Sequence, residues 1–178
     1  MSGKHFDIVL DYAKSIIDGK KNACRELIQG CQRFLDDLNK QDWEFKPKDA
    51  DFVIGIIERT FKHRQGEAPD GTPLRGTPLL LEPWEKFIVY NLLGFYFIAT
   101  NERVRKEAFI FVPRKSGKTI FSSALAWALG ILERKSGSVV YVVGAVLKEA
   151  MKSYENWSYN LTSVLYADKD TAIRIIVE

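Results

Sequence analysis

The sequence EAFIFVPRKSGKTIFSSALAWALG, at residues 107–130, joins a short strand-like run to a longer helical one. Residues 109–112 are apolar and rich in strand-forming types. Residues 119–132 have the alanine and leucine content and the apolar spacing of a helix with one apolar face. This pattern predicts a strand, a turn and a helix in succession. The turn ends in Gly117-Lys118-Thr119, the second half of the phosphate-binding pattern G-x-x-x-x-G-K-[ST].

The residue types of this turn are suited to hold a phosphate group. Gly117 allows the backbone to close around an anion, and the first N–H groups of the following helix point toward that anion along the helix dipole. Lys118 would reach the β- and γ-phosphates, and the Thr119 hydroxyl would bind Mg²⁺. Val112 occupies the place of the pattern's first glycine. The turn can therefore be interpreted either as a nucleotide site or as an ordinary connection between a strand and a helix.

Length and composition indicate a single soluble α/β domain. The chain has 178 residues, of which 46% are apolar and 28% charged, enough to bury one core. The net charge of +3 is compatible with a polyanionic partner but does not by itself indicate one. Cys24 and Cys31 are expected to be buried, reduced thiols on one helix face. The longest apolar stretch, residues 87–100, is too short to span a membrane.

Apolar spacing predicts helices on both sides of the turn. They comprise residues 6–18, 22–40, 48–62, a segment beginning near Pro83, residues 119–132 and residues 147–161. Residues 63–78 are rich in glycine and proline and are predicted to form a loop. Residues 138–144 form a β-branched run typical of a strand in a parallel sheet, and residues 171–177 could add another strand. The predicted fold class is α/β, with N-terminal helices in residues 1–78 and a partial P-loop parallel sheet with flanking helices in residues 79–178.

Several segments with characteristic sequences follow one another along the chain. They are 11–19 (DYAKSIIDG), 34–38 (FLDDL), 61–67 (FKHRQGE), 81–88 (LEPWEKFI) with 93–94 (LG), 112–119 (VPRKSGKT) and 140–145 (VYVVGA). Together they resemble the large terminase subunits of tailed bacteriophages, in the branch typified by HK97-like phages. The resemblance covers nearly the whole chain up to about residue 160.

This resemblance implies part of a viral DNA-packaging motor. Family members combine an N-terminal ATPase domain of the RecA-like (ASCE) P-loop type with a C-terminal RNase H-like nuclease domain. By resemblance the cofactors are ATP and Mg²⁺, and the partners are double-stranded DNA, the portal and the small terminase subunit. The full-length protein would form a homo-oligomeric ring in the host cytoplasm, docked on the procapsid and without membrane association.

The resemblance also assigns roles to individual residues of the turn. The nucleotide-binding residues would be Pro113, Arg114, Lys115, Ser116, Gly117, Lys118 and Thr119. Arg114 and Lys118 would be catalytic, since Arg114 is the additional basic residue of the variant loop and could stabilise the transferring phosphoryl group from its own or a neighbouring subunit. Thr119 would hold Mg²⁺. A solvent-exposed Arg114 in a turn is the alternative.

Trp84 and Glu85 stand where the family has Trp-Gln, the element that recognises adenine. A glutamine amide can both donate a hydrogen bond to adenine and accept one from it. An ionised Glu85 can only accept, so the donated hydrogen bond would be missing here. Trp84 either stacks on the nucleotide or packs in the core.

ATP hydrolysis also requires a carboxylate that holds Mg²⁺ and one that orients water, which the family supplies from a strand ending in Asp-Glu. The sequence contains no such strand. Glu149 and Glu178 are the candidates should the chain hydrolyse ATP. The sequence thus indicates the N-terminal part of a terminase-type ATPase, or a non-catalytic nucleotide-binding or assembly module that docks on another terminase chain or the portal. A different P-loop enzyme would explain the turn but not the upstream segments.

Overall fold

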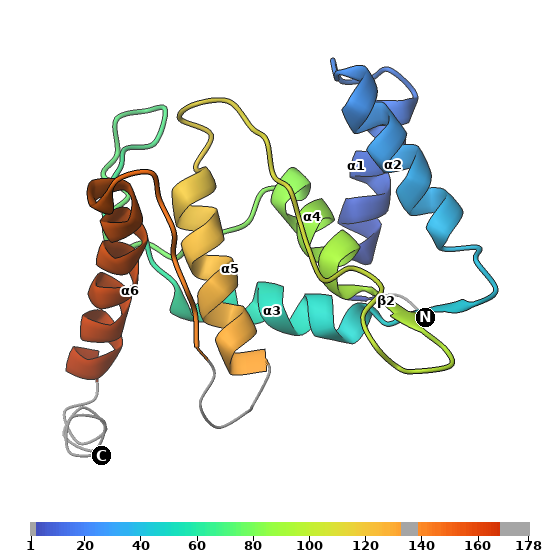
Figure 1. The fold of residues 1–178 in the computed structure, drawn as a ribbon. Coiled ribbons are helices and arrows are strands. Elements are labelled where there is room, and N and C mark those ends of the chain that lie inside the picture. Colours follow the sequence, from blue (N-terminus) through green and yellow to red (C-terminus); the bar gives the residue numbers. More distant parts are fainter. Residues whose placement is uncertain (1–2, 133–138, 168–178) are drawn as a thin grey trace. The chain divides into compact units, whose positions relative to one another are not determined.

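The fold is given by a computed structural model, which describes residues 3–132 and 139–167. These residues form six helices and one sheet of two antiparallel strands (Figure 1). The helices are α1 (Phe6–Ile17), α2 (Arg25–Asp37), α3 (Pro47–Thr60), α4 (Pro83–Leu93), α5 (Lys118–Leu132) and α6 (Leu147–Ala167), and the strands are β1 (Trp43–Phe45) and β2 (Phe95–Phe97). All six predicted helices are confirmed, with shifted ends. Residues 171–177 and Glu178 lie outside the described residues.

The predicted parallel P-loop sheet is wrong. Neither residues 109–112 nor the described residues 139–144 form a strand, and the sheet within the described ranges is the antiparallel pair β1–β2. A run with high strand propensity needs a neighbouring strand to pair its N–H and C=O groups. Neither run has such a neighbour among the residues described, and Phe109 and Val143 are 93% and 92% exposed. The fold is therefore mostly helical.

The chain divides into two compact units. Unit 1 comprises Met1–Ile54 and Leu81–Phe111, and unit 2 comprises Gly55–Leu80 and Val112–Glu178. Helix α3 contributes residues to both units, because the boundary falls after Ile54.

Aromatic side chains form the core of unit 1. Helices α1 and α2 lie side by side, and α4 packs against α1 (Figure 1). Phe34 of α2 is fully buried and makes edge contacts with Phe45, Phe87 and Phe95, with ring centroids 5.3–6.5 Å apart. Rings that meet edge to face gain electrostatic attraction in addition to the free energy of burial. This cluster joins α2, α4 and the two strands.

The β1–β2 pair was not predicted. It places Trp43 opposite Phe97 and Phe45 opposite Phe95. Gly94 connects α4 directly to β2, and a Cβ there would lie 2.5 Å from the Tyr90 carbonyl oxygen and 2.9 Å from the Phe45 ring. Only glycine fits this close approach.

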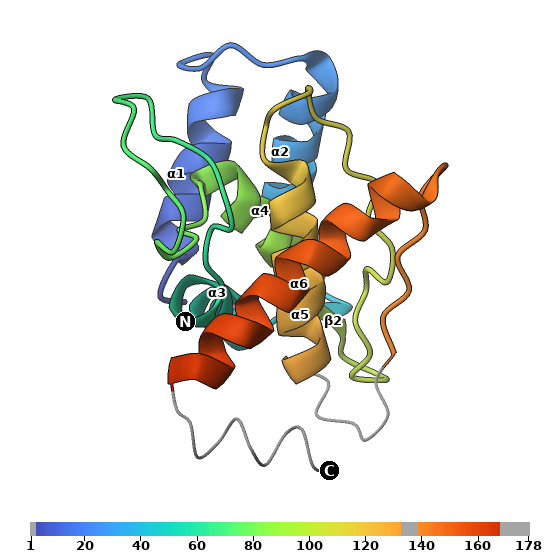
Figure 2. The same cartoon turned by 90° about the vertical axis from the view of Figure 1, so that its left-hand side faces the viewer.

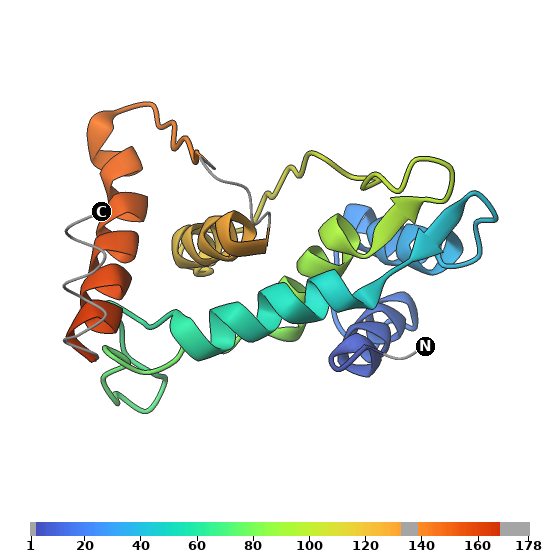
Figure 3. The same cartoon turned by 90° about the horizontal axis from the view of Figure 1, so that it is seen from below.

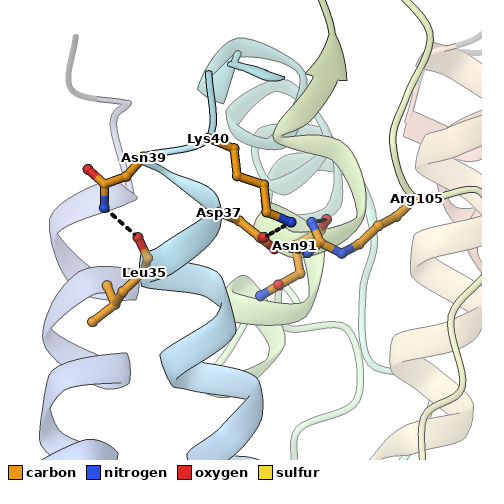
Figure 4. A network of polar contacts seen from close by, with 6 residues as sticks. All are labelled: Leu35, Asp37, Asn39, Lys40, Asn91 and Arg105. Carbon is orange, nitrogen blue, oxygen red and sulfur yellow. Dashed lines mark hydrogen bonds and ion pairs between the residues drawn. The ribbon is translucent and has the colours of Figure 1, made fainter. Parts of the chain in front are cut away.

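A polar network closes the end of α2 in unit 1 (Figure 4). Asp37 is the last residue of α2, and its side chain is 1% exposed. An acidic group at a helix C-terminus is disfavoured by the helix dipole. Two cations offset this effect: Lys40 Nζ lies 2.8 Å from Asp37 Oδ1, and the Arg105 guanidinium donates to Asp37 Oδ2. Arg105 also donates to the Asn91 carbonyl oxygen at 3.2 Å.

Unit 2 is built around the packing of α5 against α6. Figure 2 shows α6 running obliquely in front of α5, and the two helices contact each other. The residues predicted as a loop form an ordered hairpin-like segment beside α6 (Figure 3), with bridges from Lys62 to Pro78 and from Glu67 to Pro73. Asn160 of α6 is fully buried. Its side-chain amide accepts a hydrogen bond from the Lys62 N–H at 2.6 Å and donates one to the Lys62 carbonyl oxygen at 3.2 Å, as a neighbouring strand would.

The two cysteines differ in their surroundings. Both are free thiols, but Cys31 is buried in α2 whereas Cys24 precedes that helix and is exposed. The prediction that both are buried is therefore wrong for Cys24. Burial raises the pKa of the Cys31 thiol to about 11, so this group stays protonated and unreactive at neutral pH.

Candidate phosphate-binding loop

Residues 112–118 form a tight turn that leads directly into α5. Lys115 and Gly117 both have left-handed backbone conformations, with φ of 70° and 78°. Gly117 adopts this conformation without strain, whereas Lys115 does so at a cost of about 1 kcal/mol or more. The Ser116 hydroxyl donates to the Pro113 carbonyl oxygen at 2.7 Å and holds the turn closed. Left-handed residues that alternate in this way can direct successive N–H groups to one side, as anion-binding turns do.

Three cations surround the start of α5. Arg114, Lys115 and Lys118 are exposed, and within the described residues no salt bridge neutralises them. Helix α5 begins at Lys118 and has no acidic residue in its first turn. Positive side chains therefore add to the positive end of the helix dipole, which makes the surroundings of this turn favourable for an anion.

Contacts from α6 hold the N-terminal half of α5 in place. The Ser123 hydroxyl donates to the Thr119 carbonyl oxygen at 2.7 Å. Asn156 donates to the Ser123 hydroxyl at 3.3 Å, and the Trp157 indole donates to the Ser123 carbonyl oxygen at 2.8 Å. Sequence reasoning missed these positioning residues, because only the fold brings Asn156 and Trp157 to α5. The polar Ser123 and Asn156, each inside a helix, are the signal that could have pointed to a buried contact.

Glu149 lies in the first turn of α6, and the charge of Arg114 contributes to lowering its pKa. The pKa of Glu149 is lowered, first by a hydrogen bond from Lys152 and the charge of Lys152, and to a smaller extent by Lys148 and Arg114. Both carboxylate oxygens accept from Lys152 Nζ at 2.8 Å. Glu149 is thus ionised, and both of its oxygens are hydrogen-bonded to Lys152. A carboxylate with a lowered pKa and occupied oxygens is a poor general base.

The described residues offer few ligands for a metal ion. They contain no group of three or more His, Cys, Asp or Glu side chains that could hold one. Thr119 is half-buried at the start of α5. A Mg²⁺ ion there would take one hydroxyl from the protein and its other oxygen ligands from phosphate and water, which is a coordination that Mg²⁺ accepts.

Trp84 and Glu85 belong to unit 1, at the start of α4. Glu85 is 5% exposed and forms a capping box with Glu82: the Glu82 N–H donates to Glu85 Oε2 at 2.9 Å, and the Glu82 side chain accepts from the backbone N–H of Glu85. Capping explains why an acidic residue occurs here without any adenine. Burial raises the pKa of Glu85 from 4.5 to about 7. Trp84 is half-buried in the same first turn.

Comparison of the chain with protein-family models, with curated proteins and with solved structures finds no match to any of them. Among the described residues, no helix has both the length and the apolar character needed to cross a membrane.

Proposed function

We propose that this chain binds ATP with Mg²⁺ at the turn formed by residues 113–119, as the ATP-binding part of a viral DNA-packaging motor of the terminase type. The observation that carries the proposal is the cationic turn with left-handed Lys115 and Gly117 at the N-terminus of α5. Lys118 would neutralise the β- and γ-phosphates, and the backbone N–H groups of the turn would surround them. This chemistry needs no parallel sheet.

The remaining roles follow from the terminase resemblance. Arg114 would stabilise charge on the transferring phosphoryl group, and the Thr119 hydroxyl would be a ligand of Mg²⁺. Double-stranded DNA, the portal and the small terminase subunit would be the partners, in a ring docked on the procapsid in the host cytoplasm. The proposal is limited to the turn in unit 2, because the capping box gives Glu85 of unit 1 a sufficient structural role.

The charge of Lys118 provides the direct test of the site. Lys118→Ala is expected to weaken ATP·Mg²⁺ binding by about 1.5–3 kcal/mol, or roughly 10- to 150-fold in Kd, because a charge-assisted contact to phosphate is lost. Calorimetric titration of both proteins measures the difference. Lys106→Ala, which removes an exposed lysine of unit 1, serves as the matched control. Equal ATP affinities of wild type and Lys118→Ala would show that Lys118 does not bind the phosphates.

A second candidate, a non-catalytic nucleotide-binding module, is favoured by the Lys152 contact that engages Glu149. We expect the chain alone to release phosphate from ATP at a negligible rate, since Glu149, the carboxylate whose pKa is lowered by Lys152 and to a smaller extent by Arg114, is bound by Lys152. A steady-state phosphate-release assay measures this rate. Turnover that is abolished by both Lys118→Ala and Glu149→Gln would instead identify Glu149 as the catalytic carboxylate.

A further inference from the structure

Helix α6 packs with its polar side against α5 and Lys62. Ser153, Asn156 and Asn160 are buried, and Asn156 and Asn160 make the hydrogen bonds to α5 and to Lys62. An amphipathic helix normally buries its apolar side, since burial of apolar surface provides most of the stabilisation. The polar contacts of α6 leave its apolar side facing solvent.

The outward side of α6 carries a regular apolar stripe. Leu147, Met151, Tyr154 and Leu161 are 76%, 39%, 58% and 43% exposed, and the half-buried Ser158 lies in the same row. Their spacing of four, three, four and three residues is the spacing with which one helix packs along another. Single exposed apolar residues are ordinary, but four of them in one row over about four turns of a helix, interrupted by Ser158, mark an interaction surface.

Charges flank this stripe along one edge only. Lys148 and Glu155 lie seven residues apart and therefore on the same edge, whereas Ala150 and Trp157 occupy the other edge. Glu155 also pairs with Arg64 at 2.9 Å, but its side chain is still 47% exposed. If a second α6 ran antiparallel across the stripe, the Lys148 edges of the two helices would meet. Lys148 of each copy would then face Glu155 of the other.

A parallel arrangement lacks this complementarity. In a parallel helix pair the two unlike edges meet, which would place Lys148 and Glu155 opposite Ala150 and Trp157. The charge pattern therefore selects an antiparallel, two-fold symmetric contact, in which the same patch is used by both copies.

We propose that two copies of this chain associate through the outward stripe of α6, packed antiparallel about a two-fold axis. Met151 of one copy meets Tyr154 of the other near the axis, and two Lys148–Glu155 ion pairs border the seam. The contact is short and includes Ser158, so the dimer is weak and depends on concentration. This association is independent of the nucleotide site, because it uses no residue of the turn at residues 113–119.

The stripe is tested by the oligomeric state of the full chain. Analytical ultracentrifugation from about 1 to about 500 µM is expected to show a monomer that converts to a dimer as concentration rises. Met151→Lys should weaken the dimer by at least about tenfold, because a charge would be buried in the seam. Leu80→Lys, which removes an exposed apolar residue outside α6, should leave the dimer unchanged. A monomer at every concentration, or a dimer that persists in Met151→Lys, would overturn the proposal.

The orientation is tested by charge exchange. Lys148→Glu and Glu155→Lys should each weaken self-association, since each creates two like-charge contacts across the axis. An equimolar mixture of the two variants should form a heterodimer, because both contacts again join opposite charges. Absence of any recovery on mixing would rule out the antiparallel seam. Both side chains are exposed, so the test holds even if Met151→Lys does not fold. Because Glu155→Lys also removes the ion pair with Arg64, circular dichroism must show that each variant keeps its helices.

Discussion

Replacing Arg105 with methionine is expected to lower the free energy of unfolding by about 3 kcal/mol at neutral pH. The change leaves the Asp37 carboxylate, whose side chain is 1% exposed, with Lys40 as its remaining cation. Removing one partner of a buried ion pair typically costs about 3–5 kcal/mol, and the remaining Lys40 contact favours the lower figure. Methionine keeps an apolar side chain beside the Phe95 ring, over which the Arg105 guanidinium lies at 5.0 Å. Urea denaturation followed by circular dichroism measures the loss.

Two further variants isolate the charge effect at Arg105. Lys106→Met removes the neighbouring exposed Lys106–Glu102 pair and should cost less than about 1 kcal/mol. Asp37→Leu combined with Arg105→Met removes both buried charges and should recover most of the stability, because apolar residues can replace a buried ion pair. A loss for Arg105→Met no larger than that for Lys106→Met would show that the Asp37 network contributes little.

The helices of this protein could be predicted because their signal is local. Val9, Ala13 and Ile16 of α1 follow the three- and four-residue spacing of one helix face, and all three are buried as expected. The ends were less well defined, since α2 begins at Arg25 rather than near residue 22. Local spacing decides which residues are helical, but capping and tertiary contacts decide where a helix stops.

The sheet could not be predicted because strand formation depends on a partner. The run at residues 139–143 has the composition of a buried strand, yet it is exposed and forms no strand in the described structure. Conversely, Trp43–Phe45 is too short to give a periodic signal and pairs with residues about fifty positions away. Propensity describes how well a residue suits a strand, whereas pairing is a property of the whole chain.

The candidate site was partly predictable for the same reason. The position of Gly117 in a tight turn before a helix was visible in the sequence, and its positive φ agrees with that turn chemistry. The Ser123, Asn156 and Trp157 contacts that hold α5 were not visible, because they join residues more than thirty positions apart. The pattern Glu82-x-x-Glu85 at the start of a helix did contain the capping box. The terminase resemblance instead assigns Trp84 and Glu85 to an adenine element.

Replacing Glu85 with glutamine is expected to stabilise the protein above pH 7 and to leave it unchanged near pH 4.5. Burial raises the pKa of Glu85 from 4.5 in the unfolded chain to about 7 in the folded one, so the folded state holds a proton that the unfolded state releases. The wild type therefore loses stability as the pH rises from 4.5 to about 7 and regains none above it. At about 1.4 kcal/mol for each unit of pKa difference, the loss reaches up to about 3 kcal/mol. Glutamine has no proton to release and keeps an oxygen that can accept from the Glu82 N–H.

The comparison is made by urea denaturation of both proteins across this pH range. The stability of Glu85→Gln minus that of wild type should be near zero at pH 4.5 and should rise until about pH 7. Glu102→Gln supplies a control of opposite sign, because the hydrogen bond from Lys106 lowers the pKa of Glu102 and that stabilisation is lost as the pH falls. A constant difference for Glu85→Gln would mean that Glu85 ionises in the folded protein as it does in the unfolded chain. Its carboxylate would then be solvated, and the buried capping box at the start of α4 would be refuted.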